Sequence, residues 1–385
     1  MTRRKIPLFD LKLSGAAKRQ VREVMTSGWL NSGPKVREFE QAISRLAHVR
    51  YAAAVSSATA GLQLTLEALG AGPGKEVITT PFTFVATVAS IIHTGATPIL
   101  ADIDPTSLTI DPDEVARKIT SETLCVLPVD IGGRPADYAR LASICKSRRL
   151  PLVADAAHSL GAQIGRKSIA QLVDAAVHSF QATKNLTTAD GGIVLSRHKV
   201  LVDRVQLLAR HGMTAAAYQR RSSLRWAYDV VGLGHKANLS DLNAAVGLGQ
   251  LSVFDKNQAR RVRLAEQYQR RLSGLQDYLE VPVVDSGKHH AWHLYIVKLH
   301  LSRLRIGRNR LMALLAEAGI ETGVHYRPLF EMSFYRELGY TEQYFPNAAY
   351  AGRRVMSLPL YPELKLTDVD FVCDRLVQIV RRFAR

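Results

Sequence analysis

Apolar residues in the first half of the chain follow two alternating patterns. Short, nearly continuous apolar runs are separated by longer segments in which apolar residues recur every three or four positions. The short runs predict β-strands, and the recurring pattern predicts amphipathic α-helices. We expect strands at 76–81, 97–104, 123–131, 150–157, 174–180 and 191–196, and helices at 84–95, 111–119 and 136–149.

The predicted strands lack the apolar–polar alternation that is typical of a strand with one exposed face. Runs such as VLPV and PLVA are apolar at consecutive positions, so both faces of these strands are expected to be buried. Strands that alternate with helices along the chain favour a mainly parallel sheet covered by helices. The pattern therefore predicts an α/β fold.

The pattern changes beyond residue 250. One long, charged helix is predicted at 251–275, and a closing amphipathic helix at 371–383. Between them, a smaller α/β unit is indicated by strands at 281–284 and 293–299 and a helix at 308–318. We therefore predict a large domain over 1–250, with an N-terminal arm at 1–20, and a small C-terminal domain over 251–385.

Composition adds a cellular context to this picture. The chain has 385 residues, of which 47% are hydrophobic, enough for a substantial core. The three cysteines are scattered and form no CxxC pair, so neither a disulfide framework nor a zinc site is expected. No apolar stretch has the length of a signal peptide or a membrane span. These features favour a cytoplasmic protein without a membrane partner.

The charge balance favours anionic partners. Lysine and arginine total 51 against 34 acidic residues, a formal net charge of +17. The basic residues are dispersed, and no helix-turn-helix, zinc finger or RNA-recognition motif accompanies them. Nucleic-acid binding is therefore not expected, whereas a phosphorylated small molecule remains compatible with the charge.

Three chemistry-bearing residues are predicted at one edge of the sheet. Asp155 closes the strand at 150–157, Ser179 closes the strand at 174–180, and Lys184 follows in the next turn. An open parallel sheet places its binding site beyond the carboxyl ends of its strands. Each residue alone also has a structural interpretation: Asp155 as a cap, Ser179 as a local backbone partner and Lys184 as a solvated side chain.

Together the three residues match the needs of pyridoxal phosphate. A lysine amine forms a Schiff base with the aldehyde, and an acid pairs with the pyridine nitrogen. The phosphate needs hydroxyls and backbone N–H groups at a helix N-terminus, which the segment SSATAGLQLTLEALG at 56–70 can supply. No GxGxxG motif follows a strand, so a nicotinamide cofactor is not supported.

The chain resembles the nucleotide-sugar aminotransferases of the DegT type, which are fold-type-I pyridoxal-phosphate enzymes. The resemblance covers nearly the whole chain. It is carried, in chain order, by IPLFD, SGWLNSGPKVREFE, SSATAGL, PFTFVATVASIIHTGATPILADID, ADAAHSLGA, HSFQATKNLTTADGG, GLGHKANLSDLNAAVGLGQL, HAWHLYIV, GIETGVHYRPL and SLPLYP.

The resemblance implies a role for each matching residue around the cofactor. Lys184 matches the Schiff-base lysine, which also moves protons, and Asp155 matches the partner of the pyridine nitrogen. The other implied cofactor contacts are His158 at the ring hydroxyl, Phe84 stacked on the ring, Thr59, Ala60 and Ser179 at the phosphate, and Asn238 at the phosphate of a partner subunit. The resemblance thus implies a homodimer with shared active sites.

The resemblance also implies a substrate class. Trp29, His325 and Tyr326 match positions near the sugar-nucleotide pocket. The segment GHKAN at 234–238 is similar to the branch that acts at C4 of UDP-linked sugars, where many relatives have GYNYR. Two further departures are Ala58 in place of a common glycine and Phe330 in place of a common histidine; the second weakens the assignment of sugar contacts in that loop.

We therefore expect an aminotransferase that moves an amino group from glutamate to a nucleotide-linked keto sugar. The resemblance favours a UDP-linked 4-keto sugar. Two alternatives remain at this point. One is a sugar dehydratase or deoxygenation enzyme that uses the pyridoxamine form, although such relatives have a histidine where this chain has Lys184. The other is a non-catalytic regulatory protein of the same fold.

Overall fold

The protein is described by a computed structural model, which covers residues 5–214 and 227–385. The strands of its large sheet are β1 (Tyr51–Val55), β2 (Glu76–Thr79), β3 (Thr97–Leu100), β4 (Thr123–Val126), β5 (Val153–Asp155), β8 (Ala175–Ser179) and β9 (Gly192–Ser196). They form the ordered sets β1-β9-β8-β5 and β3-β2-β4. Parallel bridges Val126–Leu152 and Val129–Asp155 place β4 beside β5 and join the two sets.

The sheet is mainly parallel, as the sequence predicted. The pairs β5–β8, β2–β3 and β2–β4 are parallel, whereas β9 runs antiparallel to both β1 and β8. β5, β8 and β9 are buried along their whole length. The continuous apolar runs in the sequence therefore reflect burial on both faces.

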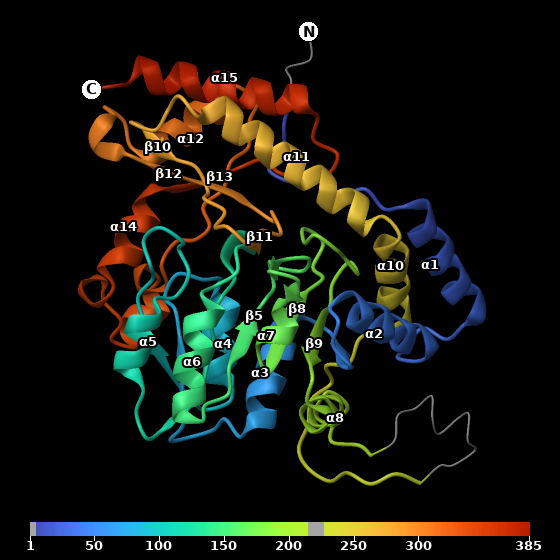
Figure 1. Ribbon diagram of the computed structural model, residues 1–385. Helices are drawn as coiled ribbons and strands as arrows, with labels where there is room; N and C mark the ends of the chain where they lie inside the picture. Colours follow the sequence, from blue (N-terminus) through green and yellow to red (C-terminus); the bar gives the residue numbers. More distant parts are fainter. Residues whose placement is uncertain (1–4, 215–226) are drawn as a thin grey trace.

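Helices cover the two faces of the sheet (Figure 1). Those of the N-terminal part are α1 (Gly15–Ser27), α2 (Pro34–Leu46), α3 (Ala58–Leu69), α4 (Val85–His93), α5 (Pro112–Lys118), α6 (Tyr138–Arg148), α7 (Ile169–Leu172) and α8 (Lys199–Leu208). Ala53 and Val55 of β1 share a core with α3 and α8, whereas their neighbours Ala52 and Ala54 share a core with α2 and α6. Successive residues of one strand thus supply both layers.

Helix α3 approaches the sheet closely because of Gly61. A Cβ atom at this position would lie 2.8 Å from Cγ1 of Val177 in β8, which is closer than two carbon atoms can approach. The missing side chain lets α3 lie directly against the sheet. This close packing brings the N-terminus of α3 to the carboxyl ends of β5 and β8.

The C-terminal part has its own small sheet and hydrophobic core. The antiparallel strands β10 (Leu279–Glu280), β12 (Tyr295–Leu299) and β13 (Val355–Leu358) pack with α11 (Phe254–Leu272), α12 (Arg308–Glu317) and α15 (Leu366–Arg382). The remaining elements are α10 (Asp241–Leu251), α13 (Ser333–Glu337), α14 (Pro346–Arg354), and the short strands β6 (Gln163–Ile164), β7 (Lys167–Ser168) and β11 (Lys288–His289). The division into domains at residue 250 stays a prediction, although a second core does form beyond it.

One predicted strand was wrong. Residues 281–284 form no strand, and β10 ends just before them at Glu280. Pro282 has no N–H to donate to a ladder, and Val283 and Val284 are exposed.

No helix within residues 5–214 and 227–385 is long and apolar enough to cross a membrane.

The N-terminal arm and the C-terminal part are joined by backbone pairing. Ile6 forms a parallel bridge with Ile320, and the Ile6 N–H donates to the Gly319 carbonyl at 2.8 Å. This pairing directs the next residues, Leu8 and Phe9, to the cavity described below.

The buried carboxylate of Asp102 connects the large sheet to the C-terminal part. It accepts hydrogen bonds from the backbone N–H groups of Asn347 and Ala348 at 2.9 Å each. These N–H groups lie in the first turn of α14, where no helical carbonyl can accept them. Asp102 thus caps α14 from a distant part of the chain.

Replacing Asp102 by alanine is expected to lower the free energy of unfolding by about 1–2 kcal/mol, because the two N–H groups of α14 and that of Ile103 lose their acceptor. Urea denaturation followed by circular dichroism measures the change. Asp277→Ala, at an exposed position, is the matched control and should change stability little. Equal stability of the two variants would contradict the capping role.

Candidate active site

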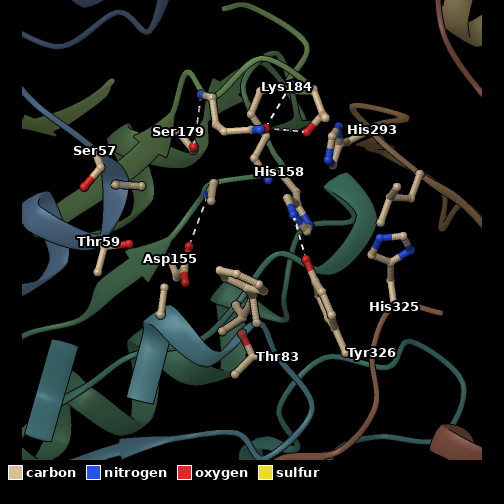
Figure 2. A pocket seen from close by; sticks show the side chains of 18 of the residues that line it. Ser57, Thr59, Thr83, Asp155, His158, Ser179, Lys184, His293, His325 and Tyr326 are labelled. Atoms are coloured by element: carbon tan, nitrogen blue, oxygen red, sulfur yellow. Dashed lines mark hydrogen bonds between the residues drawn. The ribbon is translucent and has the colours of Figure 1, made fainter. Parts of the chain in front are cut away.

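A cavity of about 570 Å³ lies beyond the carboxyl ends of β5 and β8. Its wall combines residues of the large sheet, the N-terminus of α3, the start of α4, the N-terminal arm and three C-terminal segments. Asp155 and Ser179 are the last residues of β5 and β8, and Lys184 enters from the following turn (Figure 2). The volume is typical of a small-molecule site.

Lys184 combines a nucleophilic amine with a poorly solvated position. Its backbone N–H donates to the Gln181 carbonyl at 2.9 Å, which holds the turn. Burial lowers the pKa of the Lys184 amine to about 8, and the negative charge of Asp155 opposes this shift. Roughly a tenth of the amine is therefore unprotonated at pH 7, far more than for an ordinary lysine, and the unprotonated form is the nucleophile.

Asp155 is held as a buried acceptor by a chain of donors. The Thr87 hydroxyl donates to Oδ2 of Asp155 at 2.7 Å, and the Ala157 N–H donates to Oδ1 at 3.2 Å. Because Thr87 uses its proton for Asp155, the Thr83 hydroxyl donates to Thr87, at 2.8 Å. Burial raises the pKa of Asp155, whereas the hydrogen bonds and the Lys184 charge lower it.

The N-terminus of α3 forms the side of the cavity that is suited to an anion. Ser57, Ala58 and Thr59 line it together with Ser179. The Ser57 side chain accepts the Ala60 N–H at 3.1 Å, so this N–H is already satisfied. Ala60 also does not line the cavity, and its role at the phosphate stays a prediction.

His158 has a defined tautomer. Its Nδ1 accepts the Gly132 N–H at 3.2 Å, so Nε2 carries the ring proton. Nε2 lies 3.1 Å from the Tyr326 hydroxyl and donates to it. The pKa of His158 falls well below its usual value because of burial, with Lys184 adding to the effect. The imidazole is therefore a neutral donor, and Tyr326 keeps its own proton for another acceptor.

Phe84 and His325 complete the wall opposite the sheet. Phe84 is 57% exposed, and its ring centroid lies 6.1 Å from that of Tyr326, so one face is available to a flat ligand. His325 Nδ1 is 2.8 Å from the Ser357 hydroxyl. Burial lowers the pKa of His325 to about 4. This histidine is also neutral at physiological pH.

The structure thus brings Thr59, Phe84, Asp155, His158, Ser179, Lys184, His325 and Tyr326 to one cavity. Trp29 and Asn238 do not line it. Trp29 Nε1 donates to the Ser32 carbonyl at 3.3 Å, and Asn238 Nδ2 donates to the Ser32 hydroxyl at 2.7 Å. Their roles stay predictions; for Asn238 the predicted role is in the site of a second subunit.

Sequence reasoning missed several residues of the site. Thr83 and Thr87 are four positions apart, as expected for hydroxyls on one side of a helix start, and this spacing was the available signal. Leu8 and Phe9 line the cavity from the N-terminal arm, and His293 lines it from the segment before β12. No spacing in the sequence indicates that these three residues face Lys184.

Comparison with known proteins identifies the family. The model of the DegT/DnrJ/EryC1/StrS aminotransferase family matches residues 12–377. The spore coat polysaccharide biosynthesis protein SpsC of Bacillus subtilis is 40% identical over 377 residues, which are 97% of each chain.

Solved structures agree with this match. The sugar aminotransferase Spr1654 of Streptococcus pneumoniae, in its PMP form, has a TM-score of 0.91 at 29% identity, covering 97% of this chain and all of that one; it is also known in a PLP form. DesI, solved with its TDP-sugar product, has a TM-score of 0.87 at 31% identity, covering 96% and 91%. The chain therefore belongs to the DegT/DnrJ/EryC1/StrS aminotransferase family and is a pyridoxal-phosphate-dependent sugar aminotransferase.

Proposed function

We propose that this enzyme transfers the amino group of glutamate to a nucleotide-linked keto sugar, and that the sugar is a UDP-linked 4-keto sugar. The observation that carries the proposal is the pairing of a buried, partly unprotonated Lys184 with the buried carboxylate of Asp155 in one cavity. DesI, of the same family, was solved with a TDP-sugar product, which supports a nucleotide-linked substrate.

The residues present fit the cofactor. The first turn of α3 offers backbone N–H groups, and Ser179 offers a hydroxyl, for the phosphate. Asp155 can accept a hydrogen bond from the protonated ring nitrogen. The contact of His158 with the ring hydroxyl stays a prediction, because the Nε2 proton is donated to Tyr326. When bound, the pyridine ring supplies an electron sink for the bonds that are broken at the substrate carbon.

Lys184 has two tasks in this arrangement. Its Nζ atom would hold the cofactor covalently, for which the unprotonated amine is needed. When free, the same Nζ atom would accept a proton from the Cα atom of the amino donor and hold it for return. A pKa of about 8 suits both tasks, because the amine can gain and lose a proton near neutral pH.

The other residues orient and insulate this chemistry. Phe84 offers a ring face to the flat cofactor, and Thr87 keeps Asp155 in place. Leu8, Leu358 and Leu360 line the cavity and limit access of water. Tyr326 can direct its hydroxyl proton to a substrate oxygen, because His158 already donates to it.

We further propose a homodimer with shared sites. Tyr228, Val230, Val231 and Leu233 are exposed on one segment, and the short chain from there to Asn238 leads back to β1. Exposed apolar side chains gathered on one segment are typical of an interface. In addition, Lys184 is the only lysine or arginine among the described residues that line the cavity. A second subunit can supply the missing positive charge for a diphosphate.

The substrate is tested by offering the pyridoxamine-loaded enzyme a panel of UDP-, dTDP- and GDP-linked keto sugars. We expect UDP-linked 4-keto sugars to restore the visible absorbance of the lysine-bound cofactor fastest. Lys184→Ala should show no such absorbance and lose at least ~10³-fold in activity, since both tasks of the amine are lost. Full transamination by this variant would refute the role of Lys184.

The electrostatic coupling of Lys184 to Asp155 predicts a pH shift. In cofactor-free protein, labelling of Lys184 by an aldehyde with borohydride trapping should have a midpoint near pH 8. Asp155→Asn should move the midpoint to lower pH, because the carboxylate stabilises the charged amine. Peptide mass spectrometry measures the labelling. Asp374→Asn, on α15, is the control; a rise in the Asp155→Asn midpoint would contradict the coupling.

Shared sites predict subunit complementation. Lys184→Ala and Asn238→Ala homodimers should each have low activity. A mixed dimer carries one site with both residues intact, so refolding the two variants together should restore about a quarter of wild-type activity. Steady-state assays of the mixture measure this recovery. An additive activity without recovery would place Lys184 and Asn238 in the same subunit's site or would remove Asn238 from the site.

A further inference from the structure

His293 is a buried histidine that lines the cavity. None of the cofactor contacts proposed above involves it. It lies just before β12 and is 7% exposed. Its ring lines the same cavity as Lys184, and the ring centroids of His293 and His158 are 4.4 Å apart. Figure 2 shows it beside Lys184 and His158, above His325.

The hydrogen bonds of Asn185 define the tautomer of His293. Nδ2 of Asn185 donates to the Ala291 carbonyl at 2.7 Å, an oxygen that can only accept. The other end of the amide, Oδ1, lies 3.3 Å from Nδ1 of His293. Because Oδ1 can only accept, Nδ1 of His293 carries the ring proton. Nε2 therefore presents a lone pair.

That lone pair faces the cavity. Among the described residues, three buried side-chain atoms lack both solvent contact and a partner: Arg134 Nε, Arg261 Nε and Tyr295 Oη. Nε2 of His293 is not one of them, and no protein group within the described ranges donates to it. It therefore retains accessible surface, which for this ring lies in the cavity that it lines.

The backbone of His293 is fixed as well. The buried guanidinium of Arg261 on α11 donates through Nη1 to the carbonyls of Trp292 at 3.2 Å and His293 at 3.5 Å. The same atom donates to the carbonyl of Leu360, another residue that lines the cavity, at 2.9 Å. The acceptor is thus held in place before any ligand arrives, as a specificity contact requires.

The surroundings keep this acceptor neutral. Burial lowers the pKa of His293 well below its usual value, and His158, Lys184, Arg261 and His325 add to the effect. A neutral lone pair accepts a hydrogen bond from a hydroxyl but attracts no carboxylate. It can therefore distinguish a sugar, which carries hydroxyls, from the carboxylates of an amino acid.

We propose that His293 is a specificity residue whose Nε2 accepts a hydrogen bond from a hydroxyl of the sugar substrate during the second half-reaction. This inference rests on the proposed function. It adds a contact that acts in one half-reaction only, because glutamate has no hydroxyl to donate.

Three variants separate this contact from general effects on the loop. His293→Leu removes the acceptor. His293→Gln can place an amide oxygen near the former Nε2 while its NH₂ group donates to Asn185. His290→Leu is the matched control: it is a buried histidine of the same segment, its Nδ1 accepts the Trp292 N–H at 2.8 Å, and it faces a different cavity.

The two half-reactions are measured separately in stopped-flow experiments on the holoenzyme. His293→Leu should slow the reaction of the pyridoxamine-loaded form with the keto sugar by roughly 10-fold, the effect of one unpaired buried acceptor. The reaction of the pyridoxal form with glutamate should stay within about twofold. His293→Gln should recover part of the loss, and His290→Leu should affect both half-reactions alike or neither.

Calorimetry gives a readout that does not depend on turnover. Titration of UDP-glucose and of UDP into the pyridoxamine-loaded enzyme measures how much the sugar adds to the binding affinity. We expect His293→Leu to reduce that gain by roughly 5- to 10-fold and to leave the affinity for UDP unchanged.

The outcomes distinguish the two hypotheses. If the wild-type enzyme converts no keto sugar of the panel, the proposed function fails. If the wild type converts one, but His293→Leu leaves the sugar half-reaction unchanged or slows both half-reactions equally, the proposed role of His293 fails. An unchanged preference of His293→Leu for UDP-glucose over UDP would also overturn it.

Discussion

The active site depends on keeping a carboxylate charged at a place where water cannot stabilise it. Asp155 ends a buried strand, and burial alone favours its neutral form. Two hydrogen bonds, from Thr87 and Ala157, offset part of the desolvation cost in the free protein. The nearby amine of Lys184 offsets a further part. A bound pyridine ring that carries a proton would satisfy the same carboxylate. The site is thus built around a negative charge that gains stability when the cofactor arrives.

The same low polarity gives the histidines of the cavity a common property. His158, His293 and His325 all have pKa values below the usual range because of burial and the nearby cationic groups. They remain neutral, so each acts through one donor and one acceptor whose positions are set by its partner. Gly132 makes Nε2 of His158 a donor, whereas Asn185 makes Nε2 of His293 an acceptor. Two neighbouring rings of the same residue type, tilted by 43° to one another, therefore offer opposite hydrogen-bonding groups.

The sequence allowed the large sheet and the residues at its edge to be predicted, because strand ends are local features. Asp155 and Ser179 close two apolar runs, and parallel strands carry such ends to one edge. The contacts missed are those between distant segments: Thr87 with Asp155, 68 residues apart, and Asn185 with His293, 108 residues apart. No local pattern encodes them. The strand predicted at 281–284 was wrong for another reason, since Pro282 interrupts the apolar run there.

A single cavity in this enzyme has to accept two unlike substrates in turn. Apolar side chains in its wall, such as Leu294 and Leu358, attract neither substrate by charge. Lys184 is assigned to the chemistry itself in the proposed function. Under the proposed function, discrimination would rest on neutral hydrogen-bonding groups; an acceptor among them is satisfied by a hydroxyl and not by a carboxylate. Tyr326 and His293 supply one donor and one acceptor of this kind on either side of His158. Because both groups are oriented by the protein before binding, a sugar that uses them incurs little of the ordering cost.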